Sequence, residues 1–267
     1  MEILAVKNLS FAYPLCVQNT LDNLSFSVEK GDFTVVCGAT GSGKTTLLRM
    51  LKRELTPLGE KTGEILYNGK SLKKLDELTS ACKIGYVMQR PEQQLVTDKV
   101  WHELAFGLEN MGLPQQMIRR RVSEMSSYFG IESWFDKSVS DLSGGQKQLL
   151  NLAAVMVMQP DILILDEPTA QLDPIAASDF IGTLQKLNRE LSLTIILVEH
   201  RLEDVIPICD KLLVMEKGKI LDYGAARKIA ENMRAHPAIL QAMPAAVRLY
   251  NQLDVPSPCP LTVREGR

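Results

Sequence analysis

The chain has 267 residues, enough for one large domain or two small ones. Its 45% hydrophobic and 23% charged residues are ordinary for a soluble globular protein and exclude a disordered or fibrous chain. Thirty lysines and arginines stand against 32 acidic residues for a net charge of −2, so bulk charge does not hold this chain to nucleic acid or to an anionic membrane.

Three further features limit the class of protein. The longest nearly apolar stretch, residues 149–158, is interrupted by Asn151 and is shorter than the ~20 residues that cross a bilayer. The first residues show no basic region followed by an apolar one, so we expect no secretory signal peptide. The five cysteines form no CxxC pair, which predicts free thiols and fits a reducing cytosol.

In chain order, residues 1–30 alternate in short strands. With a β segment at residues 64–66 that ends in the turn Asn68-Gly69, they predict a small antiparallel sheet. Elsewhere, apolar runs of strand length alternate with helical patterns, which predicts an α/β protein with a buried, largely parallel sheet. These runs are residues 33–37, 84–88, 162–165, 194–198 and 212–215.

Helical patterns dominate the middle of the chain. Residues 98–141 lack β-rich runs and predict a helical subdomain, at about residues 90–150, inserted into the α/β core. A later helix is expected to begin at Pro174, with Asp173 as its N-cap.

Two charged clusters in this helical region are interpreted as surface features. Arginines 119–121 lie in an amphipathic pattern and predict a solvated helix face. His102 and Glu103 lack the second histidine of a zinc motif, so we expect a surface pair on a helix and no metal site.

The α/β core is predicted to end near residue 228, leaving residues 229–267 as a C-terminal extension. Apolar side chains recur behind Pro244 with helical spacing, at positions 246, 249, 250 and 253, and predict an amphipathic helix. The proline-rich residues 256–260 predict an extended linker.

A glycine-rich loop joins the strand at residues 33–37 to a helical pattern with leucines 47, 48, 51 and 55. This strand, loop and helix form the context of a P-loop, in which backbone N–H groups and the helix N-terminus bind phosphates. Lys44 is expected to reach the β and γ phosphates of a nucleoside triphosphate, and Thr45 to bind Mg²⁺. The predicted nucleotide-binding residues are Gly38, Ala39, Thr40, Gly41, Ser42, Gly43, Lys44, Thr45 and Thr46.

Two more motifs contain polar residues at the ends of predicted strands or helices. The apolar strand at residues 162–165 ends in Asp166-Glu167, which predicts Asp166 in the Mg²⁺ shell and Glu167 as the group that orients the attacking water. The motif Ser143-Gly144-Gly145-Gln146 follows Leu142 and precedes a helix. It fits a second anion site and equally an ordinary N-capped helix.

The P-loop, the LSGGQ motif and the strand with Asp-Glu, in this order, resemble an ATP-binding cassette (ABC) ATPase over about residues 1–225. The resemblance implies a P-loop NTPase (RecA-like) core with an antiparallel β subdomain and an inserted α-helical subdomain. It also implies ATP and Mg²⁺ as ligands and two cassettes that meet head to tail. Ser143, Gly144, Gly145 and Gln146 would then contact the ATP of the partner cassette.

Other family positions are matched residue by residue. Tyr13 matches the aromatic that stacks on adenine, although a packed β-sheet aromatic would look the same. Gln89 matches the Q-loop glutamine that reaches Mg²⁺ and the water and senses the membrane partner. His200 matches the switch histidine at the γ phosphate, and Asp173 matches the aspartate of the D-loop.

The segment from Gln89 to Gly112 resembles the ATPases of energy-coupling factor (ECF) importers, which take up vitamins and metal ions. Its sequence is QRPEQQLVTDKVWHELAFGLENMG. This implies a peripheral protein at the cytoplasmic face of the cell membrane. Its partners would be a second ATPase cassette, the same or paralogous, a transmembrane coupling subunit near the Q-loop and a membrane subunit that captures substrate. No nucleic-acid partner is expected.

Two other functions remain as alternatives: a soluble ABC ATPase of DNA repair or translation, and a P-loop switch. A repair ATPase would carry a long coiled-coil or zinc insertion, a translation factor two cassettes with a charged linker, and a GTPase-like switch would lack LSGGQ. We also expect this chain to be the first half of a two-cassette polypeptide or to work with a non-identical cassette, with an ordinary C-terminal tail as the alternative.

Overall fold

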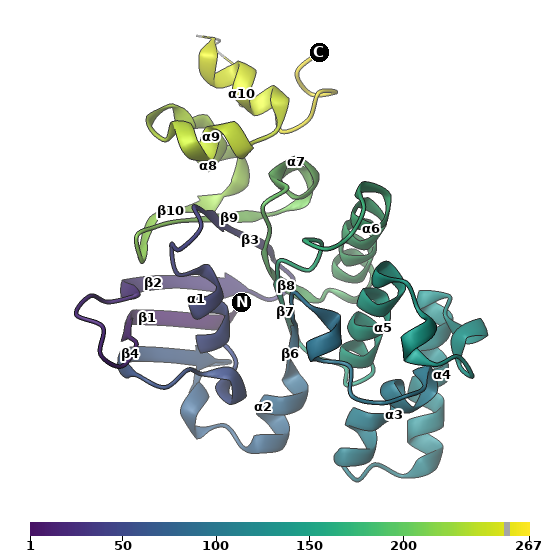
Figure 1. The fold of residues 1–267 in the computed structure, drawn as a ribbon. Coiled ribbons are helices and arrows are strands. Elements are labelled where there is room, and N and C mark those ends of the chain that lie inside the picture. The colour runs from purple at the N-terminus through teal and green to yellow at the C-terminus, as the bar shows by residue number, and fades with distance from the viewer. Residues whose placement is uncertain (254–256) are drawn as a thin grey trace. The chain divides into compact units, whose positions relative to one another are not determined.

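The computed structural model describes residues 1–253 and 257–267, which form two compact units. The first unit comprises Met1–Leu75 and Gln185–Arg267, and the second comprises Asp76–Leu184 (Figure 1). The P-loop and His200 therefore belong to the first unit. The LSGGQ motif, Gln89 and the Asp-Glu pair belong to the second.

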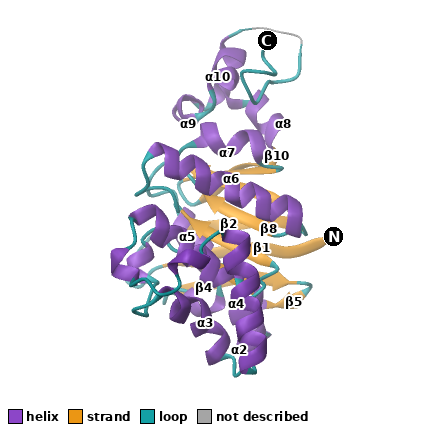
Figure 2. Ribbon diagram, turned by 90° about the vertical axis from the view of Figure 1, so that its right-hand side faces the viewer, coloured by secondary structure: helices purple, strands orange, loops and turns teal. Residues whose placement is uncertain are grey.

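The N-terminal part of the first unit is an antiparallel sheet with strand order β2-β1-β4-β5 (Figure 2). Its strands are β1 (Glu2–Ala12), β2 (Leu21–Glu29), β4 (Glu60–Tyr67) and β5 (Lys70–Ser71). β1 and β2 have 11 and 9 residues, so the expectation of short strands was wrong, while the antiparallel pairing is as predicted. Asn68 and Gly69 both have positive φ, 46° and 75°, as a two-residue hairpin turn requires.

The second sheet of this unit has the strand order β10-β9-β3-β8. β3 (Phe33–Gly38) lies parallel to both β8 (Thr194–Val198) and β9 (Lys211–Glu216), and β10 (Lys219–Ala225) runs antiparallel at the edge. Every residue of β8 is buried, which explains its continuous apolar sequence. Helix α1 (Lys44–Met50) ends before the predicted limit, because Leu55 lies in the separate 3-10 turn η1 (Arg53–Leu55).

The second unit pairs two strands and holds the predicted helical insertion. β6 (Ile84–Val87) runs parallel to β7 (Ile162–Asp166). The helices are α2 (Glu77–Lys83), α3 (Val100–Asn110), α4 (Gln115–Phe129), α5 (Gly144–Met156) and the start of α6 (Pro174–Leu191). Leu104 of α3, Val122 of α4 and Leu150 of α5 share one apolar core, and these three helices gather in Figure 1.

Burial on the helices of this unit is more extensive than a helical pattern indicates, at α5 and at Glu103. α5 is buried on more than one face, since Leu150 and Asn151 are buried and Leu149 is partly buried. Glu103 is not on the surface: it is 6% exposed, and its Oε2 accepts hydrogen bonds from Val96 N at 3.1 Å and Thr97 N at 2.8 Å. Backbone donors earlier in the chain satisfy this carboxylate, which a helical pattern cannot reveal.

His102 and two of the three arginines of the helical region lie on its surface, while Arg121 is partly buried. His102 pairs with Asp98 at 3.1 Å on the surface, and no cluster of His, Cys, Asp and Glu side chains among the described residues could hold a metal. Arg119 and Arg120 are exposed. All five cysteines are free thiols.

α7 (Leu202–Val205) lies between β8 and β9 in the chain. The C-terminal extension folds as helices α8 (Ala226–Glu231), which begins just before residue 229, α9 (Pro237–Ala242) and α10 (Ala245–Gln252), the last being the helix predicted behind Pro244. Residues 257–260, part of the predicted linker, have no regular secondary structure, and Pro256 lies outside the described residues. Cys259 is fully buried, and Arg227 of α8 donates to its carbonyl oxygen at 2.6 Å and to Glu265 at 3.0 Å.

Short 3-10 turns complete the fold, at η2 (Leu72–Lys74), η3 (Pro91–Gln93), η4 (Glu132–Trp134), η5 (Val139–Asp141), η6 (Ile206–Ile208) and η7 (Met233–Ala235). No helix in residues 1–253 or 257–267 is long and apolar enough to span a membrane.

Candidate functional site

The P-loop of the first unit connects β3 to α1 and depends on glycine at two positions. Gly38 has φ 146°, and a Cβ there would lie 2.1 Å from the carbonyl oxygen of Met215. Gly43, the N-cap of α1, has φ 97°, and its Cβ would lie 2.9 Å from Leu21 Cδ2 and from Thr20 O. A larger residue at either position would displace backbone, so the loop is constrained by its main chain.

Lys44 lies inside this loop and is only 5% exposed. Its Nζ donates to the carbonyl oxygens of Gly38 at 2.9 Å and Ala39 at 3.0 Å. Within the described part of the chain, the buried Ser42 Oγ has no hydrogen-bond partner. An enclosed ammonium, a buried hydroxyl and a helix N-terminus in one loop are groups that fit a polyphosphate.

Tyr13, just after β1, packs within its own sheet and also lies beside the P-loop helix. Its ring packs edge-on against Phe11, with centroids 4.9 Å apart at 83°. Its hydroxyl lies 3.2 Å from Thr46 Oγ1 on α1, two residues after Lys44. The structure thus brings Tyr13 to the P-loop helix and also gives the ring a packing partner within its own sheet.

His200 follows β8 and is exposed. It lines a pocket of about 240 Å³ together with residues from the end of β3 and the start of the P-loop. The pocket lining comprises Cys37, Gly38, Ala39, Thr40, Glu199, His200, Leu202, Ala238, Ile239 and Ala242. The last three belong to α9, so the C-terminal extension reaches the nucleotide side of the first unit, which sequence analysis did not foresee.

The second unit holds the acidic pair at the end of β7. Asp166 is 7% exposed and accepts a hydrogen bond from the hydroxyl of Tyr86 at 3.3 Å. Glu167 has φ 48°, a left-handed conformation that is uncommon for a residue with a side chain and is typical of functional sites. The side chain of Gln89 donates to Glu167 Oε2 at 3.0 Å, so the structure joins two residues predicted to act on the same water.

The LSGGQ motif forms a capping box at the start of α5. Ser143 Oγ accepts from Gln146 N at 3.3 Å, and Gln146 Oε1 accepts from Ser143 N at 2.9 Å. The N-cap interpretation is therefore correct, and contact with a partner's nucleotide stays a prediction. Asp173 likewise caps α6, with its Oδ1 accepting from Ile175 N and Ala176 N at 3.0 Å.

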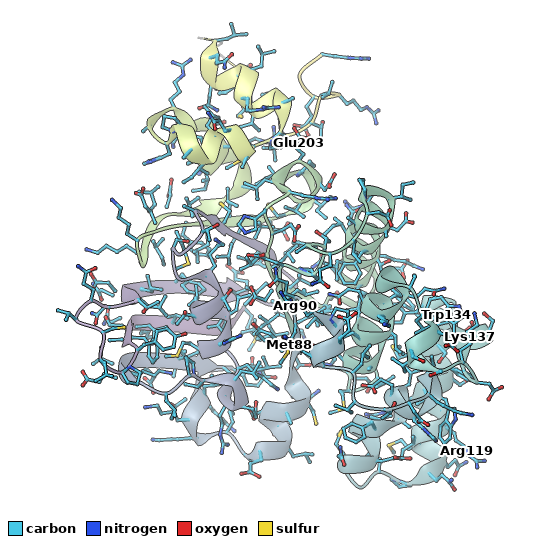
Figure 3. All side chains as sticks on the ribbon, in the orientation of Figure 1. Met88, Arg90, Arg119, Trp134, Lys137 and Glu203 are labelled. Carbon is cyan, nitrogen blue, oxygen red and sulfur yellow. The ribbon has the colours of Figure 1, made fainter. Side chains whose placement is uncertain are left out.

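A buried polar network that sequence analysis missed surrounds the end of β6. Gln94 bonds to the backbone of Tyr86 and Met88, and Gln148 and Asn151 of α5 join it. Met88 and Arg90, labelled in Figure 3, flank Gln89. The available signal was Gln148 and Asn151, two amide side chains beside the apolar positions of α5, where an unpaired buried amide would be costly.

Comparison with known proteins decides the family. Residues 21–170 match the family model described as ABC transporter. The chain belongs to this family. A Bacillus cereus protein that carries the name of an ABC transporter ATP-binding protein is 48% identical over 265 residues, 98% of this chain and 47% of the relative. This chain thus spans about half the length of the curated relatives it matches.

Solved ABC cassettes share the fold. CbiO1 from Clostridium perfringens, described as part of the ABC transporter complex cbiONQ, is 32% identical with a TM-score of 0.78, covering 90% of this chain and 93% of that one. MJ1267, an ATP-binding cassette of an ABC transporter solved in its ADP conformation, is 25% identical with a TM-score of 0.77, covering 91% of this chain and 98% of that one. The predicted fold class and family are confirmed: this is an ABC ATPase domain.

Proposed function

We propose that the chain is the ATP-hydrolysing part of an ECF-like importer at the cytoplasmic face of the cell membrane. Binding and hydrolysis of ATP would drive uptake of a vitamin or metal ion by membrane partners. The Q-loop segment from Gln89 to Gly112 supports this assignment, as does the likeness to CbiO1.

The observation that carries the catalytic part is the 3.0 Å hydrogen bond from Gln89 to Glu167. A carboxylate held by an amide keeps one oxygen oriented, and the other can accept a proton from the attacking water. Lys44 compensates charge on the β and γ phosphates, His200 contacts the γ phosphate, and Tyr13 stacks on the adenine.

Mg²⁺ accompanies ATP in this proposal and would neutralise charge on the phosphates as the water attacks. Thr45, Gln89 and Asp166 are its proposed protein ligands. Hydroxyl, amide and carboxylate oxygens are the donors that Mg²⁺ prefers, so this set fits the ion.

A second cassette completes the proposed site. Ser143, Gly144, Gly145 and Gln146 would contact the ATP bound by the partner's P-loop. The Bacillus cereus relative is about twice as long as this chain, which supports a second, non-identical cassette in the same polypeptide. ATP hydrolysis per chain should then rise steeply with protein concentration and rise further when the partner cassette is added, and a rate independent of both would contradict the dimer.

Membrane partners are tested by co-purification. The chain is purified from solubilised membranes, and the proteins that accompany it are identified. We expect a transmembrane coupling subunit and a smaller substrate-capture subunit. Multiple substitutions in residues 90–99 should weaken this assembly and leave ATP binding intact. Recovery of ribosomes or DNA-repair proteins, with no membrane protein, would favour the soluble alternative.

A further inference from the structure

Gln94 lies just after η3, five residues beyond Gln89, and its side chain pairs with the backbone at the end of β6. Its Oε1 accepts from Met88 N at 2.9 Å, and its Nε2 donates to Tyr86 O at 2.8 Å. Residues 86 and 88 present these two groups on the same edge of the strand. The Gln94 amide thus takes the place of a neighbouring strand and fixes the backbone immediately before Gln89.

The same network reaches α5. Asn151 Nδ2 donates to Gln94 Oε1 at 3.1 Å, and Gln148 Nε2 donates to Met88 O at 3.3 Å. Gln148 and Asn151 are 0% and 1% exposed and lie three residues apart on one helix face. Gln148 is only five residues beyond Ser143, within the same continuous helix. Buried amides whose partners are removed are strongly disfavoured, so this network resists separation.

We propose that Gln94 is a positioning residue that makes the start of the Q-loop and the LSGGQ helix α5 move as one body. Gln94, Gln148 and Asn151 form this latch. A displacement of the loop at residues 89–99 then moves Gln89 relative to Glu167 and moves Ser143 at the same time. The inference rests on the proposed function for its consequence, since it requires that Gln89, Glu167 and Ser143 take part in ATP hydrolysis.

Substitution of Gln94 tests the latch. In Gln94→Glu the ionised carboxylate still accepts from Met88 N but can no longer donate to Tyr86 O, and in Gln94→Leu both bonds are lost. We expect kcat to fall ~10-fold or more in both at pH 8, because small misplacement of a reacting group is costly, with the affinity for ATP within about twofold of wild type.

The pH profile separates positioning from general damage. The carbonyl oxygen of Tyr86 would face one oxygen of the introduced carboxylate, and this repulsion, with partial burial, raises the pKa of the carboxyl. Gln94→Glu should therefore regain activity relative to wild type as the pH falls from 8 to 6, because the protonated acid donates again. Gln94→Leu should stay low throughout. Gln116→Glu, the same change at an exposed glutamine on α4, is the matched control and should follow the wild-type profile.

A double-mutant cycle tests the link to α5. Asn151→Leu should lower kcat by less than Gln94→Leu, and the double variant should lose little more than Gln94→Leu alone, because both changes break one network. Additive losses, or wild-type kcat in Gln94→Glu and Gln94→Leu, would overturn the latch.

The proposed function and the latch can fail independently of each other, and different measurements decide them. If the wild-type chain hydrolyses no ATP, alone or in its membrane complex, the proposed function fails. The latch is then decided by amide hydrogen exchange, in which Gln94→Leu, which loses both backbone hydrogen bonds, must speed exchange of Met88 and of residues 146–151 together. Unchanged exchange at either place overturns it.

Discussion

The P-loop of the first unit and the Q-loop of the second are both proposed to act in ATP hydrolysis, but they are built differently. At the P-loop, main-chain geometry fixes the shape of the loop. Gly38 and Gly43 lie against backbone atoms, and Lys44 donates hydrogen bonds to the loop's own carbonyl oxygens. At the Q-loop, hydrogen bonds of side-chain amides hold the structure: Gln89 donates to Glu167, and Gln94 accepts from the backbone at the end of β6. The P-loop is held by its own backbone, whereas the exposed hydrogen bond between Gln89 and Glu167 can be exchanged for other partners.

This difference predicts that changes in the two regions affect different quantities. Damage to the P-loop should lower ATP affinity or stability. Damage to the second unit should lower turnover and leave binding intact.

The largest expected effect is that of Glu167→Gln. The amide is nearly isosteric and can still accept from Gln89, but it cannot take a proton from water. Turnover should fall by ~10²-fold or more, while ATP affinity stays near wild type because Lys44 and its loop are untouched. Equilibrium binding and steady-state hydrolysis are measured together. Normal turnover in this variant would remove Glu167 from the role given to it.

Gly43→Ala should distort the backbone of the P-loop. The added Cβ would lie 2.9 Å from both Leu21 Cδ2 and Thr20 O, in a backbone conformation with φ 97°. We expect a loss of about 1–3 kcal/mol in the free energy of unfolding and weaker ATP binding. Gly69→Ala is the control: it has a similar φ of 75° but nothing within 4 Å of its Cβ. Equal losses in the two variants would mean that backbone conformation alone, and not packing, constrains the P-loop.

The sequence predicts the P-loop region well because its signals are local. A strand of apolar residues, a glycine-rich loop and a helical leucine pattern are contiguous, so β3, the loop and α1 follow directly. The second unit is less predictable for the same physical reason. Gln94 reaches Asn151 across 57 positions, and Glu103 is satisfied by backbone N–H groups of a loop, so neither partner shows in a local pattern. The burial of Cys259 depends on α8, again distant in the chain.

Substitutions of Ser143 can separate its role as the N-cap of α5 from its proposed contact with the nucleotide. Ser143→Ala removes the cap and should cost about 1 kcal/mol of stability, with lower turnover. Ser143→Asp keeps an N-cap acceptor but brings a negative charge toward the partner's phosphates. Its thermal stability should match wild type while its turnover falls. If Ser143→Asp hydrolyses ATP normally, the motif is a helix cap alone.

The smallest effect is an alkaline loss of stability in the first unit. Burial raises the pKa of Tyr223 above its usual value near 10, with Lys211 lowering it and Asp32 and Glu29 raising it further. The tyrosine hydroxyl donates to the carbonyl oxygen of Ser27, an interaction that needs the proton. A raised folded pKa means that the unfolded chain releases its proton first as the pH rises.

The sign of the effect follows from this order of proton release. The contribution of Tyr223 is complete below pH 10 and is lost as the pH rises through the folded pKa. Lys211 acts in the same direction: burial works to lower its pKa, but its hydrogen bond to Asp32, at 2.8 Å, raises the pKa overall. Urea unfolding at pH 7 to 11 should show stability falling above pH 10. Tyr223→Phe should be less stable at pH 7, where it lacks the hydrogen bond, and should show a shallower alkaline decline. An equally steep decline in that variant would assign the loss to other groups.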